Sequence, residues 1–207
     1  KQSQRRPLDG ETYRLLRDIV DGHQPVDAAL GQQDDVRRFV GTFGGQGFAA
    51  EMEDRFGALM GQVVRLNQEA LHLGMFVLVF PQGTRSVRLS RGRTGLAQLS
   101  QHLGAAIVPI GCSGSDHLYP GDSPFSKGGR VVYRIGRPLA PDGPALAPFR
   151  VDTPFVPLSR AASLAHGAQF QAITDVVMDR INGLVDARYQ RTASDDSDGV
   201  QGVDRFL

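Results

Sequence analysis

The chain has 207 residues, of which 41% are hydrophobic and 22% charged, and its formal net charge at pH 7 is +1. This balance is typical of one globular domain with a sizeable core, and a nearly neutral chain is not expected to bind nucleic acid through bulk charge. The single cysteine, Cys112, rules out a disulfide within the chain and suits a reducing compartment, and no apolar stretch approaches the ~20 residues of a membrane span.

The first third of the chain contains two short candidate elements and one long helix. Residues 11–20 fit either a helix turn or a strand, and residues 38–43 have the pattern of a short strand. From Ala49 to Leu73, apolar residues recur at alternating steps of four and three, which predicts an amphipathic helix that Gly74 ends. We expect its apolar stripe to pack in the core; the stripe comprises Met52, Phe56, Leu59, Val63, Leu66, Ala70 and Leu73.

A buried strand and a tight turn are predicted in the middle of the chain. Residues 76–79 are all apolar, and Pro81 and Gly83 then favour a turn. Such a turn can direct backbone N–H groups and the Arg85 guanidinium toward one anion, for example a phosphate. The alternative is an ordinary turn at a strand end with a solvated arginine.

The rest of the chain alternates helical and strand patterns. A helix should follow the turn, because Thr94 is a favoured cap and Gly104 is a natural stop. This alternation predicts an α/β layered domain. The other expected elements are strands at 105–110 and 131–135, an ordered proline-rich surface excursion at 138–157, an amphipathic helix at 169–188 and a disordered tail at 191–207.

The block Phe80–Ser86 resembles a known motif. Its sequence, Phe-Pro-Gln-Gly-Thr-Arg-Ser, is similar to the Phe-Pro-Glu-Gly-Thr-Arg-Ser block of the glycerophospholipid acyltransferase family, the lysophosphatidate acyltransferase-like enzymes. Gly92–Gly95 and Ile107–Ile110 follow in the family's order, so that the resemblance covers roughly residues 70–190. It implies an acyltransferase-like fold, a mixed, largely parallel sheet flanked by helices, in a single domain over residues 1–190.

The resemblance also implies a set of residues that bind the substrate phosphate. Arg85 would be the phosphate ligand, and Gly83 and Thr84 would shape the turn. Gln82 stands where the family has glutamate, which removes one negative charge, and Arg93 stands for a lysine and keeps the positive charge.

The family's catalytic His-x4-Asp motif is not intact before this block. His23-Gln24-Pro25-Val26-Asp27 resembles it with one residue missing. By this resemblance His23 would be the general base and Asp27 would orient its imidazole. A literal His-x4-Asp runs from His117 to Asp122, after the phosphate block. Two further interpretations stay open: a chain without an intact pair of its own, and His23 as a surface histidine in a turn.

The expected function is transfer of a fatty acyl group from an acyl thioester, acyl-CoA or acyl carrier protein, to a lysophosphatidate-like acceptor. The resemblance implies no bound cofactor and no metal, with peripheral contact to a phospholipid membrane at its inner, cytoplasmic face and no nucleic-acid partner. The alternative is a catalytically degenerate relative that binds anionic phospholipid or a partner. An unrelated α/β hydrolase is disfavoured, because Gly111–Ser115 lacks the final glycine of a nucleophile elbow.

Overall fold

The computed structural model describes residues 10–20, 23, 25, 34–42, 47–83, 86–118 and 125–192. The chain divides into two compact units, one of residues 1–61 with 205–207 and one of residues 62–204, and each is described by itself. The expectation of a single domain over residues 1–190 stays a prediction. The expected disordered tail lies almost entirely outside the described residues.

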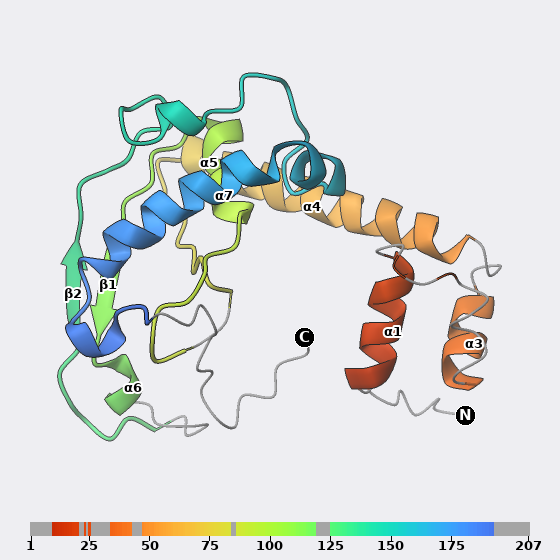
Figure 1. The fold of residues 1–207 in the computed structure, drawn as a ribbon, viewed down its shortest axis with the longest axis horizontal. Coiled ribbons are helices and arrows are strands. Elements are labelled where there is room, and N and C mark those ends of the chain that lie inside the picture. Colours follow the sequence, from red (N-terminus) through yellow and green to blue (C-terminus); the bar gives the residue numbers. More distant parts are fainter. Residues whose placement is uncertain are drawn as a thin grey trace. The chain divides into compact units, whose positions relative to one another are not determined.

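The first unit is built from helices. It contains α1 (Gly10–Val20), α3 (Asp34–Gly41) and the beginning of α4 (Phe48–His72), all visible in Figure 1. The prediction of a strand at 38–43 is wrong, because α3 turns Val40 inward as part of a small helical core. Residues 11–20 form a helix, which settles the ambiguity of that segment. The buried core residues are Leu15, Leu16, Ile19, Val40 and Phe48.

Helix α4 confirms the long amphipathic helix, but most of its apolar stripe is not buried. Glu51 lies in the first turn, where it complements the helix dipole and pairs with Arg55 at 2.7 Å. Met52 packs against the first core. The expectation that the whole stripe lies in the core is wrong, because its middle and end are exposed to solvent: Phe56 48%, Leu59 55%, Leu66 58% and Leu73 77%.

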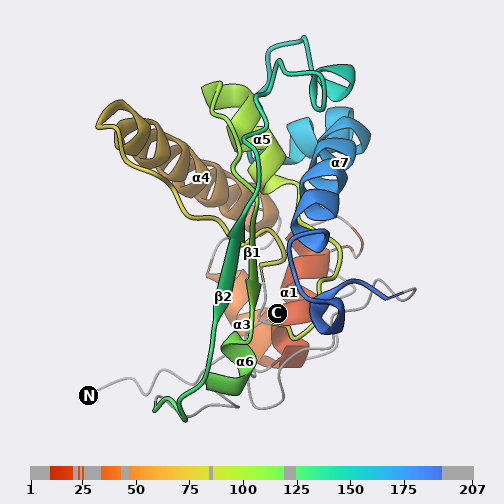
Figure 2. The same ribbon diagram turned by 90° about the vertical axis from the view of Figure 1, so that its left-hand side faces the viewer.

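The second unit contains one small sheet. Strand β1 (Ile110–Ser113) pairs antiparallel with β2 (Val132–Ile135), with Ile110 opposite Ile135 and Ser113 opposite Val132 (Figures 1 and 2). A single antiparallel bridge, Ile107 to Leu139, continues this pairing. The later strand at 131–135 is thereby confirmed, whereas the strand at 105–110 is reduced to the bridge and Ile110.

The predicted fold class, a mixed, largely parallel α/β sheet flanked by helices, is wrong. The described chain is 51% helix with only a two-stranded antiparallel sheet. Residues 76–79 are not a buried strand, because they belong to an extended run without a neighbouring strand and with exposed side chains. Parallel neighbours need a crossover, usually a helix of several turns, and the described part of the β1–β2 connection contains only the four-residue α6 (Ser115–Leu118).

Two helices form the main core of the second unit. Helix α5 (Gly95–Leu103) confirms the predicted helix, and Gly104 ends it with φ of 64°, a left-handed conformation that favours glycine. Helix α7 (Arg160–Asn182) starts and ends earlier than the predicted 169–188, since the Ser159 hydroxyl accepts from Ala162 N–H and caps it. The buried core residues are Ala97, Ile107, Leu139, Leu146, Val151, Ala162, Phe170, Ile173 and Val177.

The proline-rich segment is ordered, and it supports this core. It includes the short 3₁₀ helix η1 (Ala147–Phe149), and Leu146 and Val151 on either side of η1 are buried. The segment therefore contributes apolar side chains to the interior as well as covering the surface.

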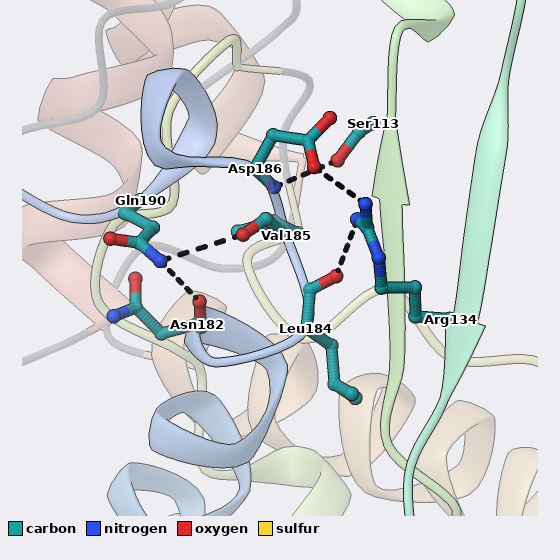
Figure 3. Close-up of polar contacts among 7 residues, drawn as sticks. All are labelled: Ser113, Arg134, Asn182, Leu184, Val185, Asp186 and Gln190. Atoms are coloured by element: carbon teal, nitrogen blue, oxygen red, sulfur yellow. Dashed lines mark hydrogen bonds and ion pairs between the residues drawn. The ribbon is translucent and has the colours of Figure 1, made fainter.

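Hydrogen bonds join the chain after α7 to the sheet, as Figure 3 shows. Arg134 of β2 donates to Asp186 Oδ1 at 2.7 Å and to the Leu184 carbonyl at 3.1 Å. Ser113 of β1 accepts from Asp186 N–H at 3.0 Å. Gln190 donates to the carbonyls of Asn182 and Val185. These bonds place the last described element, η2 (Ala187–Tyr189), beside the end of β1.

Candidate functional site

The site begins at the tight turn that follows the apolar run. Gly83 N–H donates to the Phe80 carbonyl at 3.0 Å, and Gly83 has φ of 70°. The Pro81 carbonyl accepts from Arg93 N–H at 2.7 Å. One hydrogen bond therefore closes the turn, and a second links it to the chain that precedes α5.

The Gln82 side chain adds hydrogen bonds that also hold the turn. Its Nε2 donates to Ser86 Oγ and to Ser90 Oγ, both at 2.9 Å. Ser86 Oγ in turn donates to the Arg88 carbonyl at 2.7 Å. A hydroxyl has one proton, so Ser86 accepts from residue 82, and the Gln82 amide supplies a donor that an ionised carboxylate lacks at neutral pH. Glutamine at position 82 is therefore part of the hydrogen bonding of this turn.

Arg93 supplies the positive charge beside the turn. Its Cγ lies 3.8 Å from the position that a Cβ on Gly83 would take. Its side chain is exposed, and no recorded hydrogen bond or ion pair joins its guanidinium to another described residue. The preceding Gly92 is buried where any side chain would meet Thr174 and Met178 of α7. Close packing on α7 thus holds Arg93 next to Gly83. Thr84 and Arg85 lie outside the described residues.

His23 belongs to the first unit, whereas Gln82, Gly83 and Arg93 belong to the second. The His23 side chain is 73% exposed, and its Nδ1 lies 3.9 Å from Asp18 Oδ1. Its backbone N–H donates to the Asp18 carbonyl at 2.9 Å. Asp27, the predicted orienting carboxylate, lies outside the described residues. The predicted catalytic pair therefore stays a prediction.

His117 is part of a polar cluster that the sequence did not reveal. Arg188 Nη1 lies 2.8 Å from His117 Nε2, and Arg188 Nη2 donates to Asp116 at 3.2 Å. Tyr189 O–H donates to the other oxygen of Asp116 at 2.8 Å. Because arginine only donates, this contact is a hydrogen bond only when His117 Nε2 accepts, that is, when the ring proton is on Nδ1. Asp122, the carboxylate of the literal His-x4-Asp, lies outside the described residues.

The cluster changes the proton affinity of its members. Burial by itself would raise the pKa of Asp116, but the Tyr189 hydroxyl, His117, Arg188 and the backbone outweigh it, and the pKa lies below its ordinary value of 3.8. Burial, followed by the bond to Asp116, raises the pKa of Tyr189 above its ordinary value of 10.0. Asp116 is thus an anion, and Tyr189 a neutral donor, at neutral pH.

The turn and the cluster are neighbours. Leu89 N–H, in the strand-like segment fastened by Gln82, donates to the Tyr189 carbonyl at 3.0 Å. Asp116 and Tyr189 are more than seventy positions apart in sequence, and no spacing signal connects them. Of these residues the sequence analysis had singled out His117 alone, as the first residue of the literal His-x4-Asp.

Two general properties complete the description. Among the described residues, no group of three histidine, cysteine or acidic side chains is arranged to hold a metal ion. None of the described helices combines the length and the apolar character needed to cross a membrane.

Comparison with known families, curated proteins and solved structures yields no match for this chain.

Proposed function

We propose that the chain transfers a fatty acyl group from an acyl thioester, acyl-CoA or acyl carrier protein, to a hydroxyl of a lysophosphatidate-like acceptor. The observation that carries the proposal is the turn at Phe80–Gly83, with its Phe-Pro-Gln-Gly-Thr-Arg-Ser sequence. Left-handed Gly83, the Gln82 bonds and the neighbouring Arg93 support a preorganised anion site. Arg85 would bind the phosphate through two oxygens.

His23 would act as the base of the reaction. It would take the proton of the acceptor hydroxyl while the oxygen attacks the thioester carbonyl. The new C–O bond forms, the C–S bond breaks and the thiolate leaves, taking up a proton. Asp27 would hold the imidazole in orientation. Because the thioester is already activated, the reaction needs no metal and no bound cofactor.

The charge distribution supports contact with a phospholipid surface. Between Glu69 and Asp116 the sequence has no acidic residue, and four arginines lie close together at positions 85, 88, 91 and 93. A local positive patch of this kind is attracted to anionic lipid head groups by about 1 kcal/mol for each cation near the surface. The protein would therefore meet its lipid substrate from the cytoplasmic side, as a peripheral protein.

A second candidate function is binding of anionic phospholipid without catalysis. The exposure of His23 and its 3.9 Å separation from Asp18 favour it, because a general base is normally held by a close hydrogen bond. Gln82, built into the turn in place of an acid, is compatible with either function.

Acyl transfer from palmitoyl-CoA to lysophosphatidate tests the proposal. Arg85→Ala should raise the KM for lysophosphatidate and lower kcat/KM by about 30- to 1,000-fold, because a charge-assisted contact is lost. Monoacylglycerol, which lacks the phosphate, should respond little to this change. Arg137→Ala removes an exposed arginine outside this group of four and serves as the matched control. Unchanged kinetics in Arg85→Ala would contradict the phosphate assignment.

The same assay separates the two candidate functions. His23→Ala should lower turnover by about 10²- to 10⁴-fold, the usual contribution of a positioned base. His72→Ala, which alters an exposed histidine at the end of α4, is its control. A wild-type protein that binds vesicles of phosphatidic acid but transfers no acyl group would establish the non-catalytic candidate.

A further inference from the structure

The most exposed apolar segment of the second unit is the run Met75–Phe80. It belongs to no helix, strand or turn, and Phe76, Leu78 and Phe80 expose 97%, 73% and 75% of their surfaces. Val77 and Val79, on the opposite side of the extended chain, are about half as exposed as these, at 39% and 37%. Every side chain of the run is apolar, and most of that surface faces solvent.

Most backbone groups of the run also lack partners among the described residues, although Met75 N–H donates to the Ala70 carbonyl at 2.9 Å. The N–H groups of residues 76–80 donate to no other described residue, and the recorded bond at the carbonyl side is Phe80 to Gly83 in the turn. An extended apolar chain with open N–H and C=O groups is a template for another strand. Lipid is a poor occupant, because a bilayer core cannot satisfy those backbone groups.

We propose that residues Phe76–Phe80 of this run pair antiparallel with the same residues of a second copy of this chain. The segment is self-complementary about Leu78, because that register places Phe76 opposite Phe80, and Val77 opposite Val79. Gly74, with φ of 73°, and Pro81, which cannot donate, bound the paired stretch. No charged residue lies between Leu73 and Thr84, so the pairing brings no like charges together.

The run offers apolar surface for a second copy to cover. Residues 73 to 80 of two copies together expose on the order of 1,500 Å² of apolar surface, and an edge-to-edge pairing buries part of it. Cross-strand pairing of phenylalanines adds about 0.5–1 kcal/mol for each pair. A two-fold axis through Leu78 makes the contact closed and isologous, as in most homodimers. This proposal does not depend on acyl transfer.

Single cysteines in the full-length chain test the register. In a Cys112→Ser background, Leu78→Cys should form an intermolecular disulfide under air, because the axis brings the two Leu78 positions directly opposite each other. Val77→Cys and Leu73→Cys are matched controls: both positions are exposed, but in this register their copies lie beyond the ~7 Å that a disulfide can span. We expect crosslinking at position 78 to exceed the controls by at least about tenfold.

Sedimentation of the full-length protein tests the dimer independently. Wild type should sediment as a dimer at about 100 μM, and Leu78→Lys as a monomer with the same thermal unfolding midpoint, because the replaced side chain is exposed. Equal crosslinking at all three cysteine positions would overturn the proposal, as would a monomeric wild type. A monomer that floats with anionic vesicles, and loses this property in Leu78→Lys, would replace the second copy with a membrane.

Discussion

At the residue scale, Gln82 determines whether the turn is held. Ser86 gives its only hydroxyl proton to the Arg88 carbonyl, so the side chain at position 82 must donate to it. Gln82→Glu places a carboxylate against a hydroxyl oxygen whose proton is already donated to the Arg88 carbonyl. We expect a loss of about 1–3 kcal/mol in the free energy of unfolding at neutral pH, measured by urea denaturation.

The pH dependence of Gln82→Glu shows whether its destabilisation comes from the loss of a hydrogen-bond donor or from altered packing. A protonated glutamate has one O–H donor, so the destabilisation should shrink below about pH 5, where the carboxyl takes up its proton. Gln68→Glu makes the same chemical change on the exposed surface of α4 and should have little effect. A Gln82→Glu protein as stable as wild type at neutral pH would show that the hydrogen bonds of this turn are unimportant.

Asp116 makes a second pH-dependent contribution to the free energy of unfolding. Its pKa is lower in the folded chain than its ordinary value of 3.8, so it stabilises the fold above that value. This contribution is lost as the pH falls through the lower, folded pKa. The difference in unfolding free energy between wild type and Asp116→Asn should therefore be constant near neutral pH and diminish only below about pH 4.

Tyr189→Phe provides the control for this titration. It removes the hydroxyl that donates to Asp116, one of the groups that lower the pKa, and leaves the ring in place. The loss of stability should then be complete at a higher pH than in wild type, because the folded pKa lies closer to the ordinary value at which the loss begins. An NMR titration of the Asp116 carboxyl measures the shift directly; identical titrations in both proteins would contradict this role of Tyr189.

At the scale of elements, the sequence predicted helices α4 and α5 well because their signals are local. The apolar period of α4 and the stop at Gly104 depend on neighbouring residues alone. The strand at 38–43 was wrong because so short a run with few apolar residues is equally compatible with a helix, and the burial of Val40 in one core with Phe48 decides between them.

The strands failed for a different reason. A strand at residues 76–79 exists only if another segment pairs with it, and the described residues offer none. Position and composition identified an apolar β-type run, but neither can specify its partner. The same limit applies to the site: the turn was recognisable from Pro81 and Gly83, whereas the bonds of Asp116 to Arg188 and Tyr189 depend on tertiary contacts.

At the scale of the whole molecule, the two units have separate cores. The core of the first unit centres on Val40 and Phe48, and that of the second on Phe170 and Ile173. No residue belongs to both, and the boundary between the units falls within α4, after Gly61. Stability is therefore expected to vary along the chain, with each core protecting the backbone amides of its own helices.

Hydrogen exchange on a reciprocal pair of variants tests this expectation. Phe170 is fully buried, so Phe170→Ala should cost about 3–5 kcal/mol in its own unit and speed amide exchange in α5 and α7. Amides of α1 should keep their wild-type rates. Phe48→Ala, an equal truncation of a side chain that is 2% exposed, should have the opposite pattern. If either variant accelerates exchange equally in α1 and α7, the chain unfolds as one cooperative body; a reciprocal pattern means that loss of one core leaves the other folded.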